Sequence, residues 1–260
     1  MINFGGIIKL NSDTEIQKVA DVIRRANSVV VLTGAGVSAE SGIPTFRDAL
    51  TGLWSKFNAE ELATPEAFKK NPEIVWQWYY TRRKKNSACK PNSGHYALAK
   101  MESFINDFTI ITQNVDGLHQ AAGSKNVIEL HGSLQKFVCF DNHHKIENDI
   151  VDSSPEKPPI CNICGSMARP DVVWFGEFLP DSAVMQSLQA MERANILLVV
   201  GTSGQVQPAA SFGLLAQKNG TNVVVINPDS SAIIENSIFL QGVSGKILPE
   251  LVSLAWPNLI

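Results

Sequence analysis

The hydrophobic residues of this chain gather in short runs that are rich in Val and Ile and show no polar alternation. The runs cover residues 29–32, 108–111, 127–130, 196–200 and 223–226. Strands that are buried on both faces of a parallel sheet have this composition. Segments with helical spacing lie between several runs, for example 183–193 and 208–218. The alternation predicts an α/β fold whose parallel sheet is doubly wound.

Two stretches of the chain do not follow this alternation. Residues 54–100 contain every Tyr and three of the five Trp, and their pattern is helical without an intervening strand. Residues 134–175 contain three Cys, two His and a proline-rich run. We expect these insertions to build a smaller domain beside the sheet. The predicted division gives residues 12–53, 96–133 and 176–256 to the sheet domain, and residues 54–95 and 134–175 to the smaller domain.

Composition narrows the class of protein. The chain has 260 residues, a formal net charge of −3 and 44% hydrophobic residues. High apolar content with low net charge excludes a disordered chain, and the lack of a strong positive excess argues against nucleic-acid binding. No apolar run approaches the roughly 18 residues that span a bilayer, so no membrane partner is expected. Without a secretory signal pattern or a disulfide framework, we expect a cytoplasmic protein, with a mature mitochondrial form as the alternative.

A glycine-rich turn follows the first apolar run directly. Residues 34–39 match G-x-G-x-x-A, in which Gly34 permits a tight turn and Gly36 lets a pyrophosphate approach the backbone. Ala39 is small enough for close packing, and the N-terminus of a following helix would face the anion. A dinucleotide is the expected ligand, with a purely structural turn as the alternative. Residues 53–62 are not the second buried strand of a dehydrogenase, so hydride transfer is not favoured.

Polar clusters follow the other four apolar runs. They are residues 112–119, 129–132, 201–203 and Asn227. The carboxyl ends of parallel strands form one edge of a sheet, and ligands of open α/β sheets bind in the crevice there. Any one cluster could be a helix cap or a loop, but their convergence at one edge predicts a binding site.

These motifs, taken in order, resemble those of the sirtuin family, the NAD-dependent protein lysine deacylases. The resemblance lies in GAGVSAESGIPTFRD at 34–48, TQNVDGLH at 112–119, HG at 131–132, GTS at 201–203 and IN at 226–227. It implies a large Rossmann-like domain and a smaller domain that combines a zinc module with a helical insertion. A cleft between them would hold NAD and the acylated lysine of a protein substrate.

The resemblance also implies roles for individual residues. Those expected around the pyrophosphate and the nicotinamide ribose are Gly34, Ala35, Gly36, Glu40, Phe46 and Arg47. The nicotinamide pocket would be lined by Gln113, Asn114 and Asp116, with Asn114 also taking part in catalysis. The adenosine half of NAD would be held by Gly201, Thr202, Ser203 and Asn227.

His131 would be the general base. The acyl oxygen attacks the anomeric carbon of NAD as nicotinamide leaves, and a ribose hydroxyl must then lose a proton. A histidine with a pKa near 6.5 suits that transfer at neutral pH. The alternative for His131 is a buried, hydrogen-bonded histidine at a strand end, whereas His95 and His119 are expected to be surface or packing residues.

The acyl group is predicted from a helical segment. Tyr79 and Arg82 are three residues apart, so they share a helix face, and a hydroxyl with a guanidinium can hold a carboxylate. The pair resembles the Tyr-x-x-Arg of sirtuins that remove succinyl, malonyl and glutaryl groups, and small Ala63 fits that class. Its expected neighbours are Val173, Phe175 and Gly176. We expect desuccinylase and demalonylase activity with some deacetylase activity; the alternative is a core Tyr79 and a solvated Arg82.

The metal site departs from the family's two C-x2-C pairs. Cys161 and Cys164 form one pair, but Cys139 is followed by Asn142 where the second cysteine belongs. A neighbouring histidine, His143 or His144, can complete a Cys3His set, and we take His143 as the fourth ligand of a structural Zn²⁺. A zinc-free module is the alternative.

Two other functions use the same cofactor site. One is NAD-dependent ADP-ribosyl transfer to protein, which does not explain the Tyr79 and Arg82 pair, because that reaction binds no acyl carboxylate. The other is a non-catalytic NAD sensor or scaffold, which has no need of a base at His131. We expect a monomer that acts on acylated-lysine proteins.

Overall fold

Parallel strands form the larger of two sheets in the computed structural model, which describes residues 8–10, 13–43 and 59–258. Their order across the sheet is β1 (Ile8–Leu10), β10 (Ile238–Gln241), β9 (Asn222–Asn227), β8 (Ile196–Val200), β2 (Ser28–Thr33), β3 (Asp107–Thr112) and β4 (Val127–Glu129). β2 pairs with β3 on one side and with β8 on the other, so the chain order reverses there. The predicted Rossmann-like, doubly wound sheet is confirmed, and its crevice lies at the carboxyl ends beside β2.

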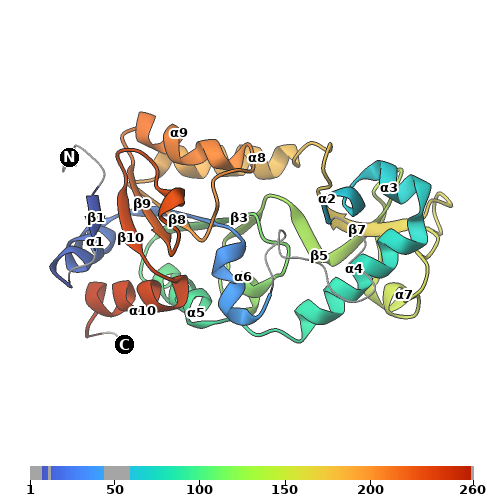
Figure 1. Ribbon diagram of the computed structural model, residues 1–260, viewed down its shortest axis with the longest axis horizontal. Helices are drawn as coiled ribbons and strands as arrows, with labels where there is room; N and C mark the ends of the chain where they lie inside the picture. Colours follow the sequence, from blue (N-terminus) through green and yellow to red (C-terminus); the bar gives the residue numbers. More distant parts are fainter. Residues whose placement is uncertain (1–7, 11–12, 44–58, 259–260) are drawn as a thin grey trace.

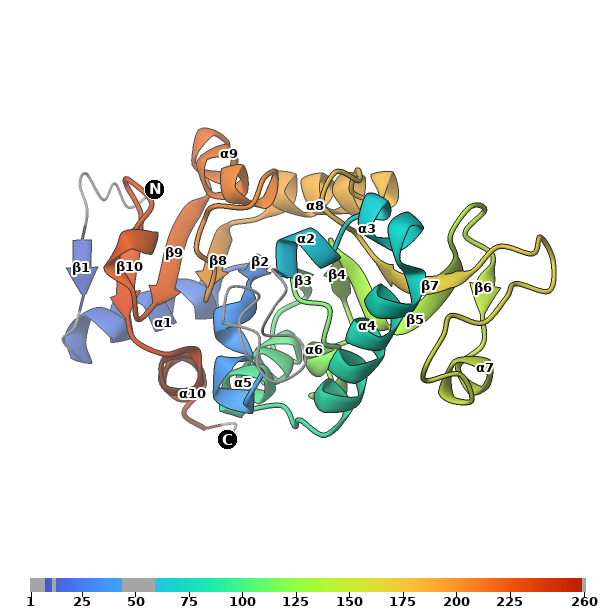
Figure 2. The same cartoon turned by 45° about the vertical axis from the view of Figure 1, so that its right-hand side comes forward.

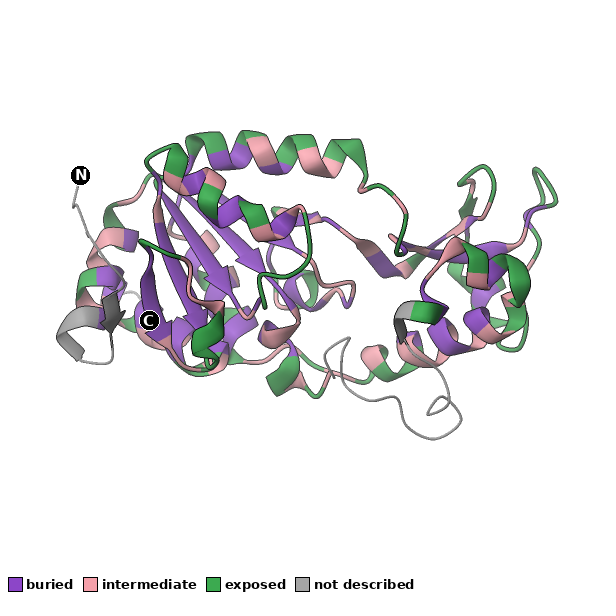
Figure 3. Ribbon diagram, turned by 45° about the horizontal axis from the view of Figure 1, so that its top comes forward, coloured by how far each residue is buried: buried purple, intermediate pink, exposed green. Residues whose placement is uncertain are grey.

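Helices cover both faces of this sheet (Figure 1), and the central strands β2, β3, β8 and β9 are buried along almost their whole length (Figure 3). Val29 and Val31 of β2 share a core with one group of helices, whereas Val30 and Leu32 share a core with the other group. The first group is α1 (Asp13–Arg25), α5 (Ser93–Glu102) and α10 (Ser244–Ala255), and the second is α8 (Asp181–Arg193) and α9 (Phe212–Lys218). Burial on both faces explains the continuous apolar runs.

The smaller domain contains an antiparallel sheet with the strand order β6, β5, β7 (Figure 2). Its strands are β5 (Gly132–Cys139), β6 (Lys145–Ile146) and β7 (Ala168–Val172). The helices beside it are α2 (Ala59–Leu62), α3 (Pro65–Lys70), α4 (Pro72–Ser87) and α7 (Asn148–Asp152). Phe68 and Trp78 from the helical insertion share one core with Leu134 and Trp174. The two irregular stretches of the sequence therefore pack together.

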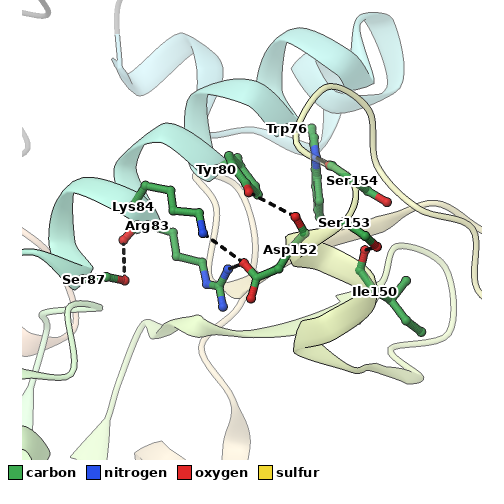
Figure 4. A network of polar contacts seen from close by, with 9 residues as sticks. All are labelled: Trp76, Tyr80, Arg83, Lys84, Ser87, Ile150, Asp152, Ser153 and Ser154. Carbon is green, nitrogen blue, oxygen red and sulfur yellow. Dashed lines mark hydrogen bonds and ion pairs between the residues drawn. The ribbon is translucent and has the colours of Figure 1, made fainter.

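Polar contacts between α4 and the α7 region fix the rotation of α4 (Figure 4). The indole Nε1 of Trp76 donates to the carbonyl oxygen of Ser154 at 2.7 Å. Arg83 lies about two turns further along the same side of α4 and donates to the carboxylate of Asp152 at 2.6 Å. The side of α4 that carries Trp76 and Arg83 is therefore held against the α7 region.

Three features of the fold were not predicted. β1 is a three-residue edge strand with Lys9 at its centre, and β10 has an apolar run too short to stand out. α5 begins at Ser93, inside the stretch assigned to the smaller domain, yet it shares the core of the larger sheet. Among the described helices, none combines the length and apolar character needed to cross a bilayer.

Candidate active site

A cavity of about 960 Å³ lies where the carboxyl ends of β2, β3, β8 and β9 meet the smaller domain. Cofactor sites commonly have a volume of this order. The predicted residues that line it are Gly34, Ala35, Gly36, Ala63, Tyr79, Arg82, Gln113, Asn114, Asp116, His131, Val173, Phe175, Gly176, Gly201, Thr202, Ser203 and Asn227. Phe46 and Arg47 lie outside the described residues.

The glycine turn after β2 packs against the turn after β8. Gly36 N donates to the carbonyl oxygen of Gly201 at 2.8 Å, and a Cβ at Gly36 would lie 2.7 Å from that oxygen. The backbone at Gly201 therefore excludes a Cβ at position 36, and the approach of a pyrophosphate to this turn stays a prediction. Two details of the prediction are wrong: Ala39 is exposed, and short 3₁₀ turns at Ala35–Val37 and Ala39–Ser41 replace the expected helix.

Glu40 points toward α10 and does not line the cavity. Its carboxylate accepts a hydrogen bond from Gly245 N at 2.8 Å and lies 3.5 Å from Ser244 Oγ, at the first turn of that helix. A carboxylate is stabilised there because the backbone N–H groups of a helix N-terminus carry positive partial charge. The structure thus places the Glu40 carboxylate against α10 and outside the cavity lining.

Polar side chains behind the glycine turn are joined by hydrogen bonds. Asp116 accepts from Ser38 Oγ at 2.7 Å and from Leu118 N at 2.9 Å. Asn114 donates its amide hydrogens to the carbonyl oxygen of Gly34 at 3.1 Å and to Ser38 Oγ at 3.2 Å. Burial raises the pKa of Asp116, and the two hydrogen bonds that it accepts oppose this shift. With both N–H groups engaged, Asn114 can present its amide oxygen, an acceptor, to the cavity.

His131 lies between β4 and β5 with its Nδ1 3.0 Å from the carbonyl oxygen of Gln113. A carbonyl oxygen only accepts, so Nδ1 carries the proton of the neutral ring and Nε2 carries the lone pair. Burial lowers the pKa of His131 below its ordinary value, against the opposing effect of the hydrogen bond to Gln113. The ring is therefore neutral at pH 7, which is the form that a general base needs.

Polar groups after β8 and β9 hold one another in place. Asn227 Nδ2 donates to the carbonyl oxygen of Thr202 at 3.0 Å, and its Oδ1 accepts from Asp229 N at 3.0 Å. Thr202 Oγ1 accepts from Gly204 N at 3.1 Å and from Gln113 Nε2 at 3.3 Å. This part of the cavity wall is therefore ordered by the protein's own hydrogen bonds.

Tyr79 and Arg82 of α4 line the part of the wall that the smaller domain contributes. Tyr79 is 4% exposed, and burial raises its pKa to about 12 against the opposing charge of Arg82. The guanidinium of Arg82 lies 4.8 Å from the centroid of the Trp78 ring, and burial lowers its pKa. Tyr79 is thus a buried residue that also faces the cavity, and Arg82 is not a fully solvated charge.

A partly buried ion pair fixes the neighbouring wall segment, 173–176. Arg169 donates to both carboxylate oxygens of Glu177, at 2.8 Å for the pair Nη2 and Oε2. Trp174 N donates to the same oxygen at 2.8 Å, and the guanidinium of Arg169 lies 3.4 Å from the centroid of the Trp174 ring. The wall that carries three predicted substrate residues is therefore held by charge and by ring stacking.

A cluster of three cysteines and one histidine lies at the smaller sheet. The ligand atoms of Cys139, His144, Cys161 and Cys164 all lie within 4.8 Å of one another. Tetrahedral Zn²⁺ with bonds of about 2.3 Å to sulfur places its ligand atoms roughly 3.8 Å apart. Backbone N–H donation at Ser166 helps to lower the pKa of Cys164 to about 6, which favours the thiolate that a metal needs. The donor set fits a structural zinc site.

The fourth ligand is His144, so the choice of His143 is wrong. His143 N donates to the carbonyl oxygen of Cys139 at 3.1 Å, and His143 has a left-handed φ of 53°. His144 Nδ1, in contrast, lies 3.6 Å from Cys161 Sγ. The backbone turn, which spacing does not define, decides between the two.

Several residues of the site were missed from the sequence. Ser38, at the centre of the hydrogen bonds behind the glycine turn, lines the cavity. The sequence signal that could have identified Ser38 is that it is a polar residue in an otherwise apolar turn. Arg169 and Glu177, whose ion pair holds the wall segment 173–176, were given no role from the sequence. Of the two roles expected for His95 and His119, surface or packing, their burial supports packing.

Known proteins are similar to this chain over most of its length. Residues 34–208 match the Sir2 family. An NAD-dependent protein deacylase of Aquifex aeolicus is 50% identical over 206 residues, covering 79% of this chain and 85% of the relative. NAD-dependent protein deacylase 1 of Archaeoglobus fulgidus is 46% identical over 239 residues, covering 91% of this chain and 96% of the relative.

Solved structures are similar over almost the whole chain. A Sir2 homologue in complex with NAD has a TM-score of 0.87 and 43% identity, with 97% of each chain covered. Sir2Af2 bound to a myristoylated histone peptide has a TM-score of 0.75 and 31% identity, covering 95% of this chain and 98% of the other. Both similarities extend through the larger sheet and the smaller domain.

Proposed function

The chain belongs to the Sir2 family of NAD-dependent protein deacylases, and we propose that it prefers lysines that carry succinyl or malonyl groups. Acetyl-lysine would be a poorer substrate. The observation that carries the acyl preference is the Tyr79 and Arg82 pair, which faces the same cavity as His131. The proposed products are nicotinamide, O-acyl-ADP-ribose and free lysine.

The residues of the cavity suit this chemistry in its separate steps. Bound NAD supplies the anomeric carbon that the acyl oxygen attacks as nicotinamide leaves. The amide oxygen of Asn114 is available to accept from the carboxamide of nicotinamide, because both of its N–H groups are used within the protein. His131 Nε2 can then take the proton of a ribose hydroxyl, while Gln113 holds the other ring nitrogen in the right tautomer.

The acyl preference follows from charge. A succinyl or malonyl group ends in a carboxylate, which would be costly to bury beside apolar walls without a partner. Arg82 offers a fixed positive charge, and Tyr79, whose pKa is about 12, keeps its proton and can donate it. Ala63 lines the same cavity and leaves room there. An acetyl group has no carboxylate for this pair to bind, so it gains less binding energy from this wall.

The test is a mass-spectrometric assay on one peptide sequence that carries succinyl-, malonyl- or acetyl-lysine, with NAD present. Arg82→Met keeps the length of the side chain and removes its charge. A lost charge-assisted hydrogen bond is worth about 1.5–3 kcal/mol, so kcat/KM for the succinyl peptide should fall about 10- to 150-fold while deacetylation is spared. Lys85→Met, an exposed change on the same helix, is the matched control and should change neither.

The same assay separates the alternatives. Equal loss of desuccinylation and deacetylation in Arg82→Met would remove the acyl preference. Modified protein without peptide deacylation would indicate ADP-ribosyl transfer, and no consumption of NAD would indicate a sensor. The monomeric state, the cytoplasmic location and the lack of nucleic-acid binding stay predictions, which light scattering, cell fractionation and a gel-shift assay can test.

A further inference from the structure

Two histidines that the reaction does not use are buried behind the cavity wall that contains Ser38, Asn114 and Asp116. His95 of α5 is 0% exposed, and His119 of α6 (Leu118–Ala121) is 1% exposed. Their ring centroids are 4.9 Å apart. Burial lowers the pKa of His95 to about 4 and that of His119 to about 3, so both rings are neutral at pH 7. A neutral imidazole has one N–H, and its position can be deduced from its partners.

The tautomer of His95 follows from the cap of α5. Asn92 N lies 3.3 Å from His95 Nδ1 and forms part of a capping box, so Nδ1 must accept. The single proton of the ring is therefore on Nε2, which lies 3.4 Å from Ser38 Oγ. His95 thus donates to Ser38, and the backbone at the start of α5 sets the direction of this bond.

The same donor-to-acceptor direction continues from Ser38 to the cavity. Ser38 has one hydroxyl hydrogen, and its partner at 2.7 Å is the carboxylate of Asp116, which can only accept while it is ionised. Ser38 Oγ in turn receives hydrogens from His95 Nε2 and from Asn114 Nδ2. The hydrogen bonds therefore run one way, from Asn92 through His95 and Ser38 to Asp116.

We propose that His95 is a positioning residue for nicotinamide. By donating to Ser38, it commits the Ser38 hydroxyl to Asp116 and keeps the Asn114 amide turned with its oxygen toward the cavity. The result is a pocket wall of acceptors, which suits the N–H groups of a carboxamide. The inference rests on the NAD-dependent reaction proposed above and adds a residue, outside the cavity lining, that sets the affinity for nicotinamide and NAD.

His119 provides a comparison within the same buried pair. Thr33 Oγ1 lies 2.8 Å from Thr112 Oγ1, to which it donates, and 3.0 Å from His119 Nε2. His119 therefore donates to Thr33, and within the described residues its Nδ1 has no hydrogen-bond partner. It has the same burial and ring contact as His95 but no bond to Ser38. A change at His119 disturbs the packing without removing the donor.

The first test uses the wild-type protein. Nitrogen-detected NMR of the histidine rings at pH 7 should show His95 as the neutral tautomer with its proton on Nε2. A proton on Nδ1 would overturn the proposal, because His95 could then not donate to Ser38. This measurement needs no variant and so does not depend on how well a substituted protein folds.

The second test compares His95→Gln with His95→Met in the full chain. Glutamine at this position can accept from Asn92 N, as in a capping box, and can still donate to Ser38. Methionine can do neither. We expect His95→Met to raise the KM for NAD and the inhibition constant of nicotinamide about tenfold, the effect of one hydrogen bond, without changing the KM for the acylated peptide. His95→Gln should stay close to wild type.

Two outcomes would overturn the proposal. One is an unchanged nicotinamide constant in folded His95→Met protein. The other is an equal rise in His119→Met, which would assign the effect to packing. We expect His119→Met to lower the melting temperature and leave the nicotinamide constant unchanged. If the wild-type protein consumes no NAD, the proposed function fails instead, so the two failures are distinct.

Discussion

Replacing Glu177 by Gln should destabilise the protein strongly, because it leaves a buried arginine without its counter-charge. The side chain of Arg169 is 4% exposed and that of Glu177 is 26% exposed. Glutamine retains the shape and one acceptor for Trp174 N, but it turns an amide N–H₂ toward the guanidinium. The change therefore removes the charge and one of the two hydrogen bonds while the volume is kept.

The magnitude follows from burial. Removing one partner of a fully buried pair costs roughly 3–5 kcal/mol. Glu177 is partly accessible to water and Gln keeps one acceptor, so we expect about 2–3 kcal/mol. For a chain of this size each kcal/mol lowers the melting temperature by about 2–4 °C, which gives a fall of roughly 4–12 °C. Glu147→Gln, which breaks an exposed pair with Lys145, should cost below about 1 kcal/mol.

The assay is thermal unfolding of both variants as a function of pH. Burial disfavours the charged form of Glu177, but hydrogen bonds from Arg169 and Trp174 outweigh this and hold its pKa below the ordinary value. A lowered pKa contributes stability above the unfolded pKa, about 4.3, and that stability is lost as the pH falls through the folded pKa. The gap between wild type and Glu177→Gln should thus narrow in acid. Equal melting temperatures of the Glu177 and Glu147 variants at pH 7 would refute the reasoning.

Three further predictions concern the cavity and the metal. Burial lowers the pKa of His131, so the acid limb of the pH profile of kcat/KM for deacylation should have its midpoint below pH 6.5, the ordinary pKa of histidine. A midpoint above pH 6.5 would contradict a buried base. Gly36→Ala places a Cβ 2.7 Å from a backbone oxygen, so it should cost roughly 1–3 kcal/mol in urea unfolding and raise the KM for NAD. His144→Ala should lose Zn²⁺ in metal analysis and lower the melting temperature, whereas His143→Ala should keep the metal; the reverse order would reject the assigned ligand.

The large sheet was predictable because its strands are buried on both faces. Val29 to Leu32 alternate between two cores, so every position is apolar and the run stands out. β10, with the short sequence Ile-Phe-Leu-Gln, and β1, at the edge, lack that signature. The convergence of polar clusters was also predictable, since it follows from parallel topology rather than from side-chain detail.

The contacts that decide individual roles were not predictable, because they depend on segments far apart in the sequence. The carboxylate of Glu40 binds the first turn of α10, and no local pattern indicates that partner. The backbone at Gly201 excludes a side chain at position 36, and the glycine motif alone does not indicate this contact. His143 and His144 are adjacent and both lie within the spacing expected before Cys161, so spacing cannot choose between them, whereas the left-handed backbone at His143 can.

Release of free lysine from a succinylated peptide by His131→Ala, at saturating NAD, tests the assignment of the base most directly. General-base catalysis contributes about 10²- to 10⁴-fold, so we expect the rate to fall by that factor while the affinity for NAD is unchanged. A variant that binds NAD and still releases lysine at more than about a tenth of the wild-type rate would contradict a base at this position.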